Sequence, residues 1–319
     1  MVPELKRAWT FVALTPVAAG CFAGHAPTTT NTPPPDDVQT AAPVAEAPPA
    51  APEPPPELPR GGRTLFPDYR LVGFCGTPGA PALGELQGDL RAKAKALEAR
   101  AATYALDRKI LPVFELIAVV VQSGAGPDGK YRRRVDDSVV DSYLNAARRT
   151  KAILLLNIQP GQSDFLTEVK TFEKYLREPD VGVALDPEWA MKPKQLPGKF
   201  YGQTTGSTLN EVAEYVSGIV AENNLPEKAL VFHEVNRDIV KDEAAVRPYP
   251  GVAVIKSVDG LGPAHTKVAT YGNLMEVKAR GVHPGFKLFF DEDTRNGGRL
   301  MSAKEVLALS PQPEYVMYE

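Results

Sequence analysis

The sequence predicts an α/β protein, and within that class a (β/α)8, TIM-like barrel. Apolar strand-like segments alternate with helix-like segments over roughly 250 residues, and eight strands can be counted, which is the repeat number and size of such a barrel. The segment Val181 to Trp189 (VGVALDPEW) resembles one barrel strand, because small residues alternate with branched ones and two acids follow at its carboxyl end. No strand is followed by the glycine pattern of a dinucleotide-binding fold. An open doubly wound sheet is therefore the second choice.

Each expected strand is a short run rich in aliphatic or aromatic residues and bounded by loop residues. The eight expected strands span residues 69–75, 110–122, 152–159, 181–188, 199–204, 229–235, 252–258 and 285–290. The fifth of these, at 199–204, has the weakest pattern. Tyr315 to Tyr318 (YVMY) remains open between an extension that closes the barrel and a tail packed against it.

Segments with helical composition fill the gaps between the strands. The expected helices span residues 83–105, 136–149, 164–177, 210–223, 238–246, 265–278 and 302–309. Ser163 is expected to cap the third helix, because a serine hydroxyl accepts a hydrogen bond from a free backbone N–H of the first turn. The basic run Lys130 to Arg134 is interpreted as a solvated loop.

Composition limits the class of partner. The chain has 319 residues, 43% of them hydrophobic, so it can bury a large core, and its net charge of -3 argues against a nucleic-acid partner. We expect a monomer that needs no cofactor. Cys75 lies in an apolar strand and is expected to be buried and unreactive.

The N-terminal region has the features of an export signal. Lys6 and Arg7 precede an apolar run, residues 8–19, which is too short to span a bilayer and has the form of a secretory signal. The run ends in VAAGC, which resembles the bacterial lipobox. The resemblance implies that Cys21 is lipidated and anchors an exported protein to a membrane of the cell envelope. An ordinary cleaved signal and secretion are the alternative.

Three parts follow from this reading. Residues 1–21 are the expected signal peptide with its lipobox cysteine, residues 22–62 a disordered linker rich in Pro and Ala, and residues 63–319 the barrel domain. A linker of this composition favours extended conformations, so it would hold the barrel away from a membrane surface.

Candidate functional residues are sought at the carboxyl ends of the strands, where the sites of such barrels form. Acids and amides gather there beside aromatic residues, a combination that suits a hydroxyl-rich ligand such as a sugar. The candidate catalytic residues are Asp186, Glu188, Asp259 and Asp291. The candidate substrate-binding residues are Asn157, Gln159, Trp189, Gln203, His233, Glu234 and Glu292.

The segment LDPEW resembles the end of the fourth strand in chitinase-type glycoside hydrolases, whose motif D-G-x-D-x-D-x-E places a catalytic acid last. On that resemblance Glu188 would be the general acid, Asp186 its neighbouring carboxylate and Gly182 the motif glycine. Ala184 and Val181 stand where the motif has its other two aspartates. Their presence puts the substrate-assisted mechanism of that family in doubt.

A second resemblance covers most of the folded part. The blocks NIQPGQSDF, DVGVALDPEW, LPEKALVFHE, VDGLG, GFKLFFDED and YVMYE are similar to those of uncharacterised bacterial secreted proteins and lipoproteins with a glycosidase-like barrel. This resemblance implies the fold and an exported location, and it implies no particular reaction.

Two functional classes follow. The first is an envelope-anchored, glycoside-hydrolase-like enzyme that acts on a cell-surface or cell-wall polysaccharide through paired carboxylates. In that reading Glu188 is the acid, its pKa is raised by Asp186, and Asp291 or Asp259 is the partner across the barrel mouth. The second class is a catalytically inactive barrel that binds carbohydrate or serves as a scaffold.

Several candidates also have structural interpretations. His233 could be a hydrogen-bonded packing residue, and Asp259 with Gly260 could form a turn. Residues 291–293 could be a solvated acidic loop or a site for calcium or magnesium. The histidines lack the helical spacing of a zinc site, so no metal is expected.

Overall fold

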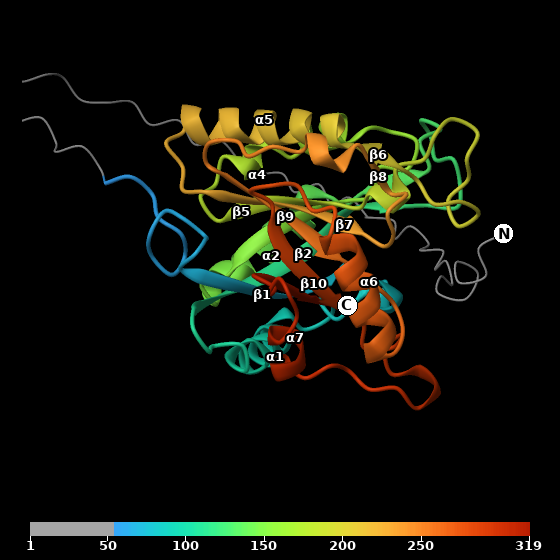
Figure 1. Cartoon of the computed structure of the whole chain (residues 1–319). Helices are drawn as coiled ribbons and strands as arrows, with labels where there is room; N and C mark the ends of the chain where they lie inside the picture. The colour runs from blue at the N-terminus through green and yellow to red at the C-terminus, as the bar shows by residue number, and fades with distance from the viewer. Residues whose placement is uncertain (1–53) are drawn as a thin grey trace, which may run out of the picture. The chain divides into compact units, whose positions relative to one another are not determined.

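The computed structural model describes residues 54–319, and within them eight parallel strands close into a barrel surrounded by helices (Figure 1). Each barrel strand pairs in parallel with the next one along the chain, and the last pairs with the first, which confirms the predicted fold class. The barrel strands are β1 Tyr69–Gly76, β2 Lys109–Val121, β4 Ile153–Ile158, β5 Val181–Leu185, β7 Lys228–Glu234, β9 Val252–Val258, β10 His283–Leu288 and β11 Tyr315–Tyr318.

Three short strands lie outside the ring. β3, Arg132–Arg134, adds to β2 in antiparallel orientation, while β6, Thr204–Thr205, pairs with β8, Val240–Lys241. The prediction of a loop over Lys130 to Arg134 is therefore wrong for Arg132–Arg134, which form β3. Glu168, which is fully buried, holds β3 in place, because it forms ion pairs with Arg132 at 2.9 Å and Arg134 at 2.7 Å.

One predicted barrel strand is wrong and another segment takes its place. Residues 199–204 run as a loop whose only strand residue is Thr204, and Phe200 in this loop is 51% exposed. The segment lacks the run of branched side chains that a strand buried on both faces needs. The eighth barrel strand is instead β11, which is buried along its whole length and pairs with β1 and β10.

The helices between the strands follow the expected order, and most are shorter than expected; α5 begins four residues earlier, and the helix expected at 164–177 is divided into α3 and α4. They are α1 Leu90–Ala102, α2 Asp137–Arg149, α3 Phe165–Lys170, α4 Glu173–Leu176, α5 Gly206–Glu222, α6 Ala264–Met275 and α7 Ala303–Leu307, with single 3-10 turns η1 Pro81–Leu83, η2 Pro187–Trp189, η3 Glu243–Ala245 and η4 Arg295–Gly297. In Figure 1, α5 lies along one side of the barrel and α1 with α7 along the opposite side.

Three helix predictions need correction. The expected helix at 238–246 is replaced by β8 and η3, and Asp242 between them adopts a left-handed conformation that ends any helix. The third helix is capped by Asp164, whose side chain accepts the N–H of Thr167, and not by Ser163. The segment at 83–105 forms a helix only from Leu90, after the cap Asp89.

Successive side chains of each strand point alternately into the barrel and out toward the helices, so the barrel has an inner and an outer surface. On β5, Val181, Val183 and Leu185 pack outward against the helices, while Ala184 faces the interior, as the sequence pattern predicts. The lower interior is apolar and includes Leu111, Ile255 and Met317. Leu58 and Leu65, which precede β1, also pack into this inner cluster. The upper interior is polar, and this is where the strands position the site.

None of the helices within residues 54–319 is long and apolar enough to cross a membrane. The predicted signal segment, the lipobox with Cys21 and most of the linker lie outside the described residues.

Candidate functional site

A cleft opens at the carboxyl ends of the barrel strands. Its empty volume, open mouth included, is about 710 Å³. The lining residues come from nearly every loop at this end of the barrel: Ala82, Gln159, Asp186, Glu188, Trp189, Tyr201, Val235, Asp259, Leu261, Lys287, Phe289, Glu292 and Glu319. Carboxyl groups dominate its polar surface, and Trp189, Tyr201 and Phe289 supply aromatic walls.

Asp186 follows the last residue of β5 and is held by two amides from the neighbouring β4 side. Asn157 Nδ2 donates to its Oδ1 at 3.0 Å, and Gln159 Nε2 donates to its Oδ2 at 3.0 Å. Burial raises the pKa of Asp186 although the charges of His233 and Lys287 oppose the rise. The two amides fix the orientation of this carboxyl group at the edge of the cleft.

Glu188 lies in the 3-10 turn that follows β5, so it does not extend the strand as expected. Its Oε2 atom is buried and accepts no hydrogen bond from residues 54–319. Burial raises the pKa of Glu188 well above the usual range, and the nearby carboxylates of Asp186 and Asp259 raise it further. A carboxyl group in this setting holds its proton more tightly than an exposed one, which is what a general acid requires.

Asp259 follows β9 and has the opposite electrostatic setting. Ser257 Oγ donates to its Oδ1 at 2.8 Å, while His233 Nδ1 at 2.9 Å and Lys287 Nζ at 3.2 Å both face its Oδ2. Burial by itself would raise the pKa of Asp259, but the positive charges of His233 and Lys287 outweigh burial and lower it to about 2. Asp259 is therefore ionised in the same cleft in which the pKa of Glu188 is raised.

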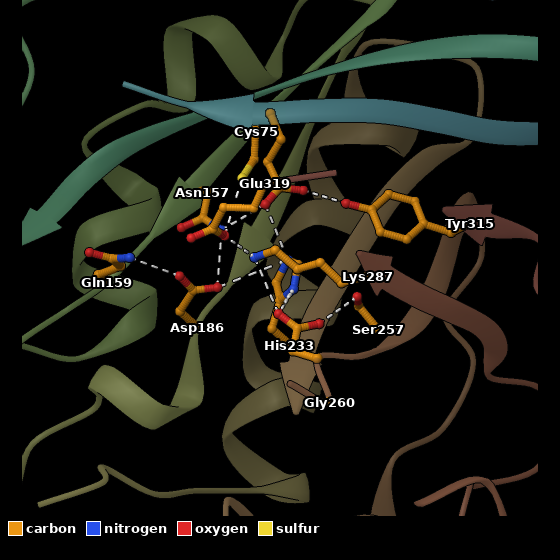
Figure 2. Close-up of polar contacts among 12 residues, drawn as sticks. Cys75, Asn157, Gln159, Asp186, His233, Ser257, Gly260, Lys287, Tyr315 and Glu319 are labelled. Carbon is orange, nitrogen blue, oxygen red and sulfur yellow. Dashed lines mark hydrogen bonds and ion pairs between the residues drawn. The ribbon is translucent and has the colours of Figure 1, made fainter. Parts of the chain in front are cut away.

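A polar network lies directly beneath the cleft, inside the barrel. Figure 2 shows its side chains converging on His233 and Lys287 from several strands. Glu115 of β2 lies 3.2 Å from His233 Nε2 and accepts hydrogen bonds from Asn157 and from the hydroxyl of Tyr315. Lys287 of β10 also contacts Glu319 Oε2 at 2.6 Å.

Four members of this network are missing from the sequence-based candidates: Glu115, Lys287, Tyr315 and Glu319. Glu115 and Lys287 stand inside strands whose other buried residues are apolar, in KILPVFELIAVVV and HPGFKL. A charged residue at an inward position of a buried strand is a signal that the sequence does carry, because an unpaired charge there is costly. Both residues lie inside their strands and not after them, so the pattern at strand ends does not include them.

The candidate residues divide into three groups by position. Asp186, Glu188, Asp259, Gln159, Trp189 and Glu292 line the cleft. Asn157 and His233 lie below it, where they contact the lining residues and not the open space. Three candidates lie elsewhere: Asp291, Gln203 and Glu234.

The three residues away from the cleft have other surroundings. Asp291 is exposed, and Gln203 accepts a hydrogen bond from Lys192 at 3.2 Å in the loop after η2. Glu234 points away from the interior, because it follows inward-facing His233 on β7, and it forms a buried ion pair with Lys256 at 2.8 Å. Of the two partners proposed for Glu188, Asp259 is thus the one in the cleft.

The acidic loop 291–293 does not gather into one site. Glu292 forms an ion pair with Arg295 at 3.0 Å, and buried Asp293 forms one with Lys267 at 3.0 Å. Within residues 54–319 no group of three or more His, Cys, Asp or Glu side chains is arranged to hold a metal ion. Cys75 is buried, as predicted, and its thiol lies 3.3 Å from Glu319 Oε2.

Comparisons with known proteins find distant likenesses of fold. No protein-family model and no curated protein matches the sequence. A crystal structure of D-psicose 3-epimerase in the presence of D-fructose is 13% identical, with 78% of this chain and 84% of that chain covered and a TM-score of 0.39. D-allulose 3-epimerase from Methylomonas sp. is 12% identical, with 79% and 84% covered and a TM-score of 0.35.

A third solved structure is the Bacillus cereus spore cortex-lytic enzyme SleL. It is 13% identical, with 76% of this chain and 58% of that chain covered, and its TM-score is 0.34. At these identities and scores, the likenesses carry no information on activity. The two family resemblances seen in the sequence stay expectations.

Proposed function

We propose that the barrel hydrolyses a glycosidic bond of a polysaccharide, with Glu188 as general acid and Asp259 as its ionised partner. The observation that carries this proposal is the opposite displacement of two carboxyl pKa values in one cleft, upward for Glu188 and to about 2 for Asp259. Hydrolysis of a glycosidic bond needs one protonated and one ionised carboxyl group, and environments that separate the two pKa values assign the roles.

The chemistry follows from these charge states. The Glu188 carboxyl gives its proton to the glycosidic oxygen as the bond from that oxygen to the anomeric carbon breaks, and the leaving sugar departs with a hydroxyl group. Positive charge develops on the anomeric carbon and ring oxygen, where the Asp259 carboxylate stabilises it. A water molecule then adds to that carbon, and its proton restores the Glu188 carboxyl.

The remaining lining residues suit a sugar. Trp189, Tyr201 and Phe289 offer aromatic faces against which sugar rings can pack, and Gln159 and Glu292 offer partners for hydroxyl groups. Asp186 lies beside Glu188 with both oxygens fixed by amides, so its role is to keep the proton on Glu188 and to orient the substrate.

The test is a glycan array probed with the full chain and read for both retention and released sugar. Glu188→Gln should retain the ligand and release at least about 100-fold less sugar, because the neutral amide cannot donate the proton. Asp291→Asn, at an exposed position outside the cleft, is the matched control and should hydrolyse at the native rate. Equal release by native protein and Glu188→Gln would refute the assignment.

The second candidate function is binding without turnover, and one observation favours it. Both oxygens of Asp259 already contact other side chains, namely Ser257, His233 and Lys287. A carboxylate held this firmly is poorly placed to attack a sugar or activate water. Retention on the array by native protein and Glu188→Gln alike, with no release from either, would establish this function.

The cell envelope is the proposed location. Support comes only from the sequence, in the apolar run and the lipobox-like VAAGC ending at Cys21. Cys21→Ser should move the protein from the membrane fraction to the soluble fraction of a bacterial expression host, since the anchoring acyl chains are lost. An unchanged membrane fraction would exclude lipidation at this residue.

A further inference from the structure

The feature that carries a further inference is the histidine beneath the cleft. His233 is fully buried, and each of its ring nitrogens faces a buried carboxyl group. Nδ1 lies 2.9 Å from Asp259 Oδ2, and Nε2 lies 3.2 Å from Glu115 Oε1. Glu115 belongs to β2 and Asp259 follows β9, so the imidazole joins two separate parts of the barrel wall.

Glu115 acts here as an acceptor through both oxygens. Asn157 Nδ2 donates to Oε1 at 2.9 Å, and the hydroxyl of Tyr315 donates to Oε2. These hydrogen bonds, together with the positive charges of His233 and Lys287, favour the ionised form of Glu115. Glu115 is therefore ionised, although burial opposes this, and its pKa is lowered.

Asp259 has an equivalent environment, in which both carboxyl oxygens face donors. Its Oδ1 accepts the hydroxyl of Ser257 at 2.8 Å, and its Oδ2 lies 3.2 Å from the ammonium group of Lys287. Both oxygens face donors, so this carboxyl group is ionised as well. The histidine is thus enclosed by two carboxylates that can only accept.

A neutral imidazole has one N–H and one lone pair, so one of its nitrogens would turn a lone pair toward a carboxylate. Only the imidazolium ion presents an N–H to both carboxylates: Nδ1 forms a hydrogen bond with Asp259, whereas Nε2 contacts Glu115 Oε1 at 3.2 Å as an ion pair outside hydrogen-bond geometry. We propose that His233 is a permanently protonated positioning residue, clamped between Glu115 and Asp259, whose buried charge keeps Asp259 ionised in the wall of the cleft. Its part in a reaction rests on the proposed function, whereas its charge state does not.

The other charged groups around His233 are consistent with this assignment. From the end of β5, Asp186 Oδ1 lies 3.9 Å from Nε2, and the charge of His233 also reaches Glu188, whose pKa it lowers in part. From β10, Lys287 is the second cation, and it is held by Asp259 and Glu319. The two cations, His233 and Lys287, are thus each in contact with two carboxylates. The charges of Asp259 and Glu115 raise the pKa of His233 well above its usual value, although burial opposes the rise.

The test is nitrogen NMR of the full chain labelled with 15N-histidine, recorded without ligand between pH 5 and pH 9. His233→Gln assigns the His233 signals by their loss, and His265→Gln, at an exposed position on α6, is the matched control for loss of one histidine. We expect both ring nitrogens of His233 to give protonated signals over this whole range. A single protonated nitrogen at pH 7 would overturn the proposal.

A second measurement addresses Asp259. In His233→Gln the carboxyl carbon signal of Asp259 should titrate at a pH higher by at least about one unit than in the native protein, because the neighbouring positive charge is gone. An unchanged titration would show that His233 does not set the charge of Asp259. If His233→Gln does not fold, substitution of His25, His265 and His283 assigns the His233 signals by elimination, and the first measurement still decides.

The two NMR measurements do not depend on whether the protein hydrolyses glycans. Protonated His233 signals together with an absence of glycan hydrolysis would refute the proposed function and leave the charge assignment standing. Glycan hydrolysis by a protein whose His233 is neutral would refute the assignment and leave the function standing. Where hydrolysis is found, the acidic limb of its pH profile should move upward in His233→Gln, since Asp259 is then protonated at a higher pH.

Discussion

Glu188 destabilises the folded protein at high pH, because its carboxyl group is buried beside other carboxylates. The folded protein holds the proton of this carboxyl group more tightly than the unfolded chain does, because burial and two neighbouring carboxylates raise its pKa above the ordinary 4.5. The folded state thus binds more protons than the unfolded state as pH rises above 4.5. Linkage then requires that Glu188 lowers the stability of the protein progressively with increasing pH.

Glu188→Gln should consequently be more stable than the native protein at neutral and higher pH, since glutamine carries no charge to desolvate. We expect its Tm to be at least about 2 °C higher at pH 8 and equal to the native Tm near pH 4. Thermal unfolding followed by circular dichroism at pH 4, 6 and 8 measures the difference. A Tm difference that does not change with pH would show that Glu188 ionises normally in the folded protein.

Among individual residues, the sequence predicted the rim of the cleft better than its floor. Asp186, Glu188 and Asp259 could be found because each follows an apolar strand, where side chains of parallel strands meet. Asp291 was assigned by the same rule, and it is exposed because it lies beyond Phe289 and Phe290 in the loop. The partners of His233 could not be found by this rule, since pairing across the interior depends on strand register.

At the scale of elements, β5 depends on a glycine for its close approach to two neighbouring strands. A Cβ atom at Gly182 would lie 2.6 Å from the carbonyl oxygen of Ala229 on β7 and 2.8 Å from Leu155 Cδ2 on β4. Real Cβ atoms do not come this close to backbone, so a larger residue forces the strands apart. In the sequence, Gly182 is one of the small residues that alternate with branched ones along this strand.

Gly182→Ala should destabilise the protein by about 2 kcal/mol, within the usual cost of overpacking a core. Gly218→Ala is the matched control, because Gly218 lies on α5 with open space where the Cβ would stand, and it should stabilise by about 0.5 to 1 kcal/mol. Urea unfolding of both variants checks the pair. Equal effects of the two substitutions would mean that the strands around β5 can move apart freely.

At the scale of the whole molecule, the sequence predicted a barrel of eight strands but not which eight. Alternation of apolar strands and helices is a local pattern, and it identified seven barrel strands. The sequence left the eighth strand, YVMY, undecided between a segment that closes the barrel and a tail packed against it. The segment is short, and only its pairing partners distinguish a barrel strand from a packed tail. Those partners are β1 and β10, more than two hundred residues and about thirty residues away along the chain.

Closure by β11 should therefore control folding of the entire barrel. This strand supplies four buried side chains, Tyr315 to Tyr318, and it satisfies the backbone groups of β1 on one side and β10 on the other. Burying four such side chains stabilises by on the order of 6 to 12 kcal/mol, which is comparable to the total stability of a protein domain. A chain without residues 315–319 should not unfold cooperatively, and its near-ultraviolet circular dichroism should be lost.

Tyr315→Phe, which keeps the strand and removes only the hydroxyl that contacts Glu115, should still unfold cooperatively at a destabilisation of about 1 to 2 kcal/mol. A truncated chain that unfolds at the native midpoint would show that seven strands suffice to hold the interior network together.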